Sequence, residues 1–87
     1  MKNIPKVPFE IEKYSRPILD SVYKIHTTLG PGLLESVYEM CLVHELSKSS
    51  IKSERQVPLP VVYDGIKMEG GFRVDVLVEN CIIIELK

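Results

Sequence analysis

The sequence has little of what several common classes of protein require. It contains only two cysteines, Cys41 and Cys81, which are far apart and form no CxxC pair. This argues against a zinc site or a disulfide framework, and favours two small apolar side chains in a reducing compartment. No apolar run approaches the roughly 20 residues that span a bilayer, and the N-terminus lacks the apolar segment of a signal peptide. We therefore expect a cytoplasmic protein with no membrane segment.

An excess of charge of either sign is also absent. The chain has 11 basic and 12 acidic residues and a formal net charge of −1. This balance argues against a protein that binds nucleic acid through bulk positive charge. An enzyme that acts on nucleic acid stays open, because clustered carboxylates are what a metal site requires. No Walker sequence occurs, and residues 30–35 lack the third glycine of a dinucleotide fingerprint.

The composition is typical of a globular protein. Apolar residues make up 45% of the chain and charged residues 26%, as in soluble folded domains. A chain this short buries only about 60% of the surface that its unfolded form exposes. We expect one domain, or part of one, with a small core.

The first half of the chain has helical periodicity. Residues 1–14 contain two prolines and are predicted to form an N-terminal arm, followed by a domain over residues 15–87. Ser15 can cap a helix that begins near residues 16–17, since proline is tolerated in the first turn. The helix is expected to end at Gly30-Pro31-Gly32.

A second helix and several strands are predicted after this turn. One-sided apolar spacing within residues 34–46 indicates the helix, which the serine-rich residues 47–50 end. The pattern then becomes β-rich, and Asp64-Gly65 is a tight-turn signal. The predicted order is helix, helix, strand (56–63), short return strand, strand (72–78) and strand (81–87). This is an α/β chain of α+β order, with two N-terminal helices packed on a mainly antiparallel sheet.

Charged residues inside apolar strands are the clearest functional signal. Glu85 and Lys87 are two residues apart on the last strand, so they share a face. Asp75 interrupts the apolar alternation of the preceding strand. Buried charges are expensive unless they are paired or used, and two carboxylates beside a lysine suit Mg²⁺ or Mn²⁺. The alternative is a Glu85–Lys87 pair on a solvated edge strand, with Asp75 merely exposed.

The loop between these two strands decides whether the carboxylates can meet. A two-residue loop at Glu79-Asn80 would place Asp75 opposite Ile84. An odd loop or a bulge would place it opposite Glu85. We predict an odd loop or a bulge, because otherwise the two carboxylates cannot share a metal ion.

Three further residues are candidates for the same site. Glu35 lies within the apolar arc of the second helix and should face the sheet, but it would also suit the N3 position of a capping box if Gly32 were the cap. Tyr38 is expected in the core, with its hydroxyl bonded to a polar group. Gln56, at a strand start, could hydrogen-bond an acid of the active site or a substrate.

The segment from His26 to Glu39 resembles the signature of the GxxExxY protein family. Gly32, Glu35 and Tyr38 supply the residues of that name. Further matching segments follow in the order typical of the family: Glu45-Leu46, Gln56, Tyr63-Asp64-Gly65, Arg73-Val74-Asp75 and Glu85-Leu86-Lys87. The resemblance runs from about residue 18 to the last residue.

This family is grouped with the PD-(D/E)xK nucleases, so the resemblance implies a restriction-endonuclease-like αβββ core. It implies that Asp75 and Glu85 bind Mg²⁺ or Mn²⁺, that Lys87 assists the attacking water, and that Glu35 supports the site. Val74 stands where the "PD" motif has proline. The helix and strand that follow this core do not occur in the 87 residues, so we expect a truncated domain with an exposed C-terminal edge strand suited to homodimer pairing.

Two functions follow from the resemblance. The first is a metal-dependent phosphodiester hydrolase acting on DNA or RNA. The second is a catalytically inactive binding or dimerisation module with the nuclease fold, favoured by the near-neutral charge and the truncation. The family favours an enzyme, and the truncation favours an inactive chain.

Overall fold

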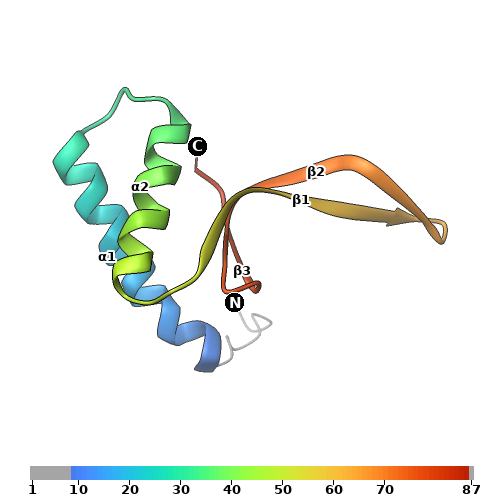
Figure 1. Ribbon diagram of the computed structural model, residues 1–87, viewed down its shortest axis with the longest axis horizontal. Coiled ribbons are helices and arrows are strands. Elements are labelled where there is room, and N and C mark those ends of the chain that lie inside the picture. The colour runs from blue at the N-terminus through green and yellow to red at the C-terminus, as the bar shows by residue number, and fades with distance from the viewer. Residues whose placement is uncertain (1–8, 87) are drawn as a thin grey trace, which may run out of the picture.

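The computed structural model describes residues 9–86. Two helices, α1 (Phe9–Leu29) and α2 (Glu35–Lys48), precede three strands, β1 (Ser53–Tyr63), β2 (Ile66–Val78) and β3 (Ile82–Ile84). The strands form one antiparallel sheet in the order β1-β2-β3. Figure 1 shows the helices side by side at one end of the sheet, with the β1–β2 hairpin extending away from them. The expected α+β arrangement is confirmed.

Helix α1 begins earlier than predicted. It starts at Phe9 and carries Pro17 in its interior, so the expected start near residues 16–17 is wrong. Residues 9–14 of the predicted N-terminal arm are helical, and residues 1–8 of that arm lie outside the described residues. An interior proline costs about 3 kcal/mol because it removes a hydrogen bond and clashes with the preceding turn. Tyr14 packs against the core together with Ile18 and Ile25, and this burial offsets the cost. No helix within residues 9–86 is long and apolar enough to cross a membrane.

The turn between the helices is built on glycine and one tyrosine. Gly30 and Gly32 have φ values of 71° and 98°, which favour glycine because it lacks a Cβ. The Tyr38 hydroxyl donates to the carbonyl oxygen of Gly30 (2.5 Å) and accepts from the N–H of Leu33 (3.2 Å). The predicted helix stop and the predicted polar partner for Tyr38 are both confirmed.

Charge also links the two helices. Glu45 of α2 lies 3.1 Å from the Lys24 ammonium of α1 and 3.2 Å from Lys48. The hydrogen bond from Lys24, aided by Lys48, holds the pKa of the Glu45 carboxyl below its ordinary value. The same bond raises the pKa of Lys24.

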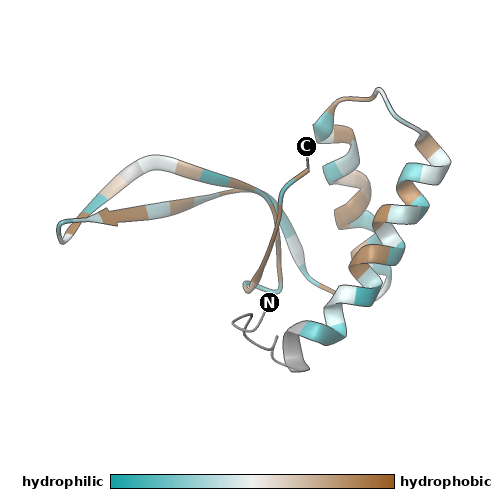
Figure 2. Cartoon of the chain, turned by 180° about the vertical axis from the view of Figure 1, so that it is seen from behind, coloured by the Kyte–Doolittle hydropathy of each residue, from teal (hydrophilic) through white to brown (hydrophobic). Residues whose placement is uncertain are grey.

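The core lies between the helices and the proximal half of the sheet. Its buried side chains come from all three parts of the fold: Ile18, Ile25, Leu42, Leu46, Ile51, Val76 and Val78. Figure 2 shows apolar segments in both helices and in the part of the sheet beside them. Within residues 9–86, both helices cover one end of the sheet and no helix covers the other end.

The β1–β2 hairpin differs from the prediction in the start of β1 and in the number of its strands. β1 begins at Ser53, three residues before the predicted start at residue 56. The expected return strand and the strand at 72–78 form a single strand, β2, with a register shift opposite Leu59–Val61. Gly70, with φ of 76°, lets the strand continue through this irregularity. The predicted turn at Asp64-Gly65 is present, with both residues at positive φ. Pro58 and Pro60 lie on an edge strand, as expected.

Candidate metal centre

Asp75 lies three residues before the end of β2. It directly precedes Val76, which pairs with Ile84, the last residue of β3. Val78 pairs with Ile82 and Val76 pairs with Ile84, so residues 79–81 form a three-residue loop. The predicted odd loop is therefore confirmed, and the same register sets Asp75 opposite Glu85. The Asp75 carboxylate accepts a hydrogen bond from the N–H of Leu86 (2.8 Å). This bond holds the segment after β3 against the acid.

Glu35 occupies the first position of α2. The N-cap is Leu34, which makes no side-chain capping bond, so Glu35 stands at N1 and not at N3. The capping-box alternative is therefore wrong, because that motif needs its glutamate at N3. A carboxylate at N1 is favoured by the positive end of the helix dipole. Glu35 is exposed and is available to a ligand from that position.

Glu39, one helical turn further along α2, is a site residue that the sequence reasoning missed. It is only 2% exposed. Its carboxylate accepts from Gln56 Nε2 at 2.9 and 3.1 Å, and it pairs with Arg55 at 3.2 Å. A buried carboxylate needs such partners. Gln56 was predicted to bond an acid, and it does. The acid is Glu39, which the prediction did not name.

The backbone of β1 adapts to hold Glu39. Neighbouring residues of a regular strand point to opposite faces, yet Arg55 and Gln56 both reach this one carboxylate. Gln56 has a φ of 53°, a left-handed conformation that costs a residue with a side chain about 1–2 kcal/mol. The β1–β2 register is the same before and after Gln56, because Arg55 pairs with Val76 and Val57 with Val74. The departure from regular strand geometry is therefore confined to Gln56. Local strain of this kind concentrates at functional sites.

Three carboxylates converge at the junction of α2 and β2. Glu35, Glu39 and Asp75 each offer an oxygen, and these oxygens all lie within 4.8 Å of one another. Arg55 brings one positive charge to three negative ones, which leaves an excess of negative charge. Carboxylate oxygens are the ligands of hard cations such as Mg²⁺ and Mn²⁺. The donor set therefore fits a divalent cation.

The other predicted site residues are placed differently. Glu85 follows β3, is exposed, and is not one of the three clustered carboxylates, although its register faces Asp75. Lys87 lies outside the described residues. The hydroxyl of Tyr38 is hydrogen-bonded to the turn before α2. It therefore helps to fix the backbone that positions Glu35.

Comparison with known families agrees with this geometry. A family model described as the PD-(D/E)XK nuclease superfamily matches residues 12–87. The chain belongs to the PD-(D/E)XK nuclease superfamily. Nucleases of this superfamily generally use divalent metals, in keeping with the acidic cluster. No curated protein and no solved structure matches the chain.

Proposed function

We propose that the chain is a metal-dependent phosphodiester hydrolase acting on nucleic acid. The observation that carries this proposal is the convergence of Glu35, Glu39 and Asp75 in a member of a nuclease superfamily. Mg²⁺ or Mn²⁺ is the proposed cofactor, because the donors are carboxylate oxygens. A divalent cation at such a site polarises a phosphoryl oxygen and lowers the pKa of a bound water.

The residues of the chain have distinct proposed roles. Asp75 and Glu35 hold the cation, and Glu39 completes the set from its buried position. Arg55 and Gln56 keep Glu39 oriented through the bonds that they make to its carboxylate.

Glu85 and Lys87 form the E-x-K part of the superfamily pattern. We assign Glu85 to the cation on the side of Asp75, in the register that the β2–β3 pairing gives it. Lys87 would orient the attacking water and offset charge that develops on the phosphate.

We also assign the chain to the GxxExxY group within the superfamily, because the motif has a physical explanation here. Gly32 takes a φ of 98° in the turn that precedes α2. Glu35 is the first helical residue and joins the carboxylate cluster. Tyr38 bonds back to the turn. The three motif residues together fix where Glu35 is presented.

Cleavage of end-labelled DNA and RNA oligonucleotides tests the function. We expect cleavage that requires Mg²⁺ or Mn²⁺, stops with EDTA and is abolished by Asp75→Asn. Asp64→Asn is the matched control, since Asp64 lies at the exposed hairpin turn and asparagine also tolerates its φ of 55°. Cleavage that is equal in both variants, or indifferent to metal, would refute the proposal.

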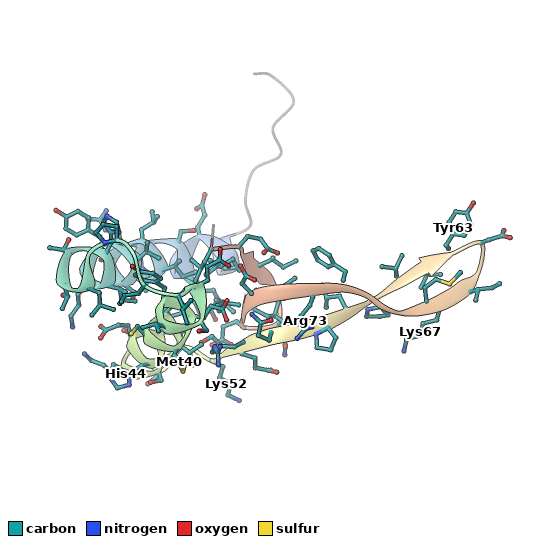
Figure 3. The ribbon with its side chains drawn as sticks, turned by 90° about the horizontal axis from the view of Figure 1, so that it is seen from above. Met40, His44, Lys52, Tyr63, Lys67 and Arg73 are labelled. Carbon is teal, nitrogen blue, oxygen red and sulfur yellow. The ribbon has the colours of Figure 1, made fainter. Side chains whose placement is uncertain are left out.

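A dimerisation module is the second candidate, and the hairpin favours it. Val61 pairs with Met68 and Tyr63 with Ile66, so these four apolar side chains share one face, and all are at least 41% exposed. Figure 3 shows Tyr63 and Lys67 on opposite sides of the hairpin. Exposed apolar patches often mark interaction sites. The outer edge of β3 offers a further pairing surface.

Sedimentation velocity over a range of protein concentrations tests this second function. A dimer without metal-dependent cleavage would support it, and a monomer at all concentrations would exclude it.

A further inference from the structure

A cavity of about 500 Å³ adjoins the carboxylate cluster. It lies between the end of α1, the turn before α2, the first half of α2 and the segment after β3. Its apolar walls come from Val22, Ile25, Leu33, Leu42 and Leu86. This volume is within the range of about 300–1,000 Å³ that small-molecule sites occupy.

Two residues join the cavity to the cluster. Glu35 lines the cavity and also belongs to the three clustered carboxylates. Leu86 also lines the cavity, and its backbone N–H donates to the Asp75 carboxylate. A ligand in the cavity would therefore lie directly beside a phosphate held at the cluster.

The rim of the cavity is preformed. The Tyr38 hydroxyl ties Gly30 and the N–H of Leu33 together, so the turn that carries Leu33 is held before any ligand arrives. A binding site that is already ordered does not lose affinity to the ordering of its own loops.

The charges around the cavity indicate which kind of ligand it can bind. Its lining includes two carboxylates, Glu35 and Glu85, against a single imidazole, His26. Without a bound cation this balance repels an anion, so the phosphate belongs at the cation and not in the cavity itself. A flat, uncharged heterocycle fits better, because its faces can pack on the apolar walls and its edge can bond to the polar groups.

We propose that the cavity holds the nucleobase of the nucleotide whose phosphate is bound at the carboxylate cluster. This inference rests on the proposed function and adds to it a subsite for one unpaired base. Its consequence is that the base, and not only the phosphate, contributes to binding. Substrates with a base free to leave the stack, such as single strands, are therefore preferred.

Nucleotide titrations followed by NMR test the proposal on the 87-residue chain. In the presence of Mg²⁺, we expect adenosine 5′-monophosphate to bind about tenfold more tightly than ribose 5-phosphate, since packing of the base on the apolar walls removes apolar surface from water. Val22→Phe fills the cavity and should remove this difference without changing the affinity for ribose 5-phosphate. Leu19→Phe, at an exposed position of the same helix, should keep it.

Leu33→Ser provides a second variant that avoids the core, since Leu33 is 45% exposed. It should weaken adenosine 5′-monophosphate binding and spare ribose 5-phosphate. Equal affinity of the wild type for both compounds, or a base advantage that survives both cavity variants, would overturn the proposal.

Adenosine without metal separates the base site from the metal site. Shifts at Leu33 and Leu86 with adenosine, without any Mn²⁺ effect at the cluster, would refute the proposed function and keep the base site. A Mn²⁺ effect at the cluster, without adenosine shifts at these residues, would refute the base site alone.

Discussion

Glu39 is a charged side chain buried in a domain that has only a small core. Its carboxylate is held by Arg55 and Gln56, and two more carboxylates lie within 4.8 Å. Burial of a charge is costly unless it is paired, and left-handed Gln56 adds strain. A domain this small would not retain both costs for packing alone, which is why we interpret the arrangement as a metal site.

Arg55→Met tests this interpretation at the level of one residue. It leaves Glu39 buried with one neutral partner, so we expect the free energy of unfolding to fall by about 1–3 kcal/mol. Urea unfolding in EDTA measures this change. Lys52→Met, at an exposed position close in sequence, should change stability by less than about 0.5 kcal/mol. Equal effects of the two variants would contradict the pairing.

The sequence pointed to Asp75 directly, whereas its signal for Glu39 was present but not used. Asp75 interrupts an apolar strand, and a metal site there required the odd loop that the structure has. Glu39 carried a usable signal, because it precedes Leu42 by three residues and Leu46 by seven and so lies on the buried face of α2. Its partners could not be predicted, since the φ of Gln56 that brings them together follows from tertiary packing.

At the scale of elements, the turn between α1 and α2 sets the position of Glu35. Tyr38→Phe removes one bond to the Gly30 carbonyl and one from the Leu33 N–H. We expect a loss of about 1–2 kcal/mol in the free energy of unfolding, at about 1 kcal/mol for each bond, and a weaker Mn²⁺ affinity. Tyr23→Phe, on an exposed tyrosine of α1, is the control. Unchanged stability in Tyr38→Phe would show that the turn is held by other contacts.

The link between the helices should depend on pH. Because the pKa of Glu45 is lowered in the folded chain by Lys24 and Lys48, its charge stabilises the fold above its ordinary pKa. This contribution is lost as the pH falls through the lowered value. The raised pKa of Lys24 keeps the pair intact until strongly alkaline pH.

We therefore expect Glu45→Gln to be less stable than the wild type at neutral pH, with the difference vanishing in acid. Urea unfolding across a pH series measures it, and Glu54→Gln on β1 is the control. A difference that grows as the pH falls would contradict the assignment.

Element boundaries were predicted less well than element types. The start of α1 was wrong because Pro17 signals a first turn locally, whereas Tyr14 extends the packed stripe. The return strand merged with the next strand because Gly70 can take a positive φ inside β2. Both errors come from local rules that tertiary packing overrides.

At the scale of the whole molecule, the chain combines a packed end with an extended hairpin (Figure 1). The change from helical to alternating period near residue 51 was enough to predict two helices followed by a sheet. The position of the N-terminus of α2 beside Asp75 could not be predicted from this change. Periodicity predicts which face of a helix or strand is buried, but not how a helix is placed across a sheet. The carboxylate cluster is a product of that crossing.

The central claim is that this cluster binds a divalent cation, and Mn²⁺ titration followed by NMR tests it most directly. We predict selective broadening of the amide signals of Glu35, Glu39 and Asp75, which is lost in Asp75→Asn and retained in Asp64→Asn. Broadening that is centred away from the cluster and its neighbours Gln56, Glu85 and Leu86, for example around Glu45, or no broadening at low molar ratios, would contradict the claim.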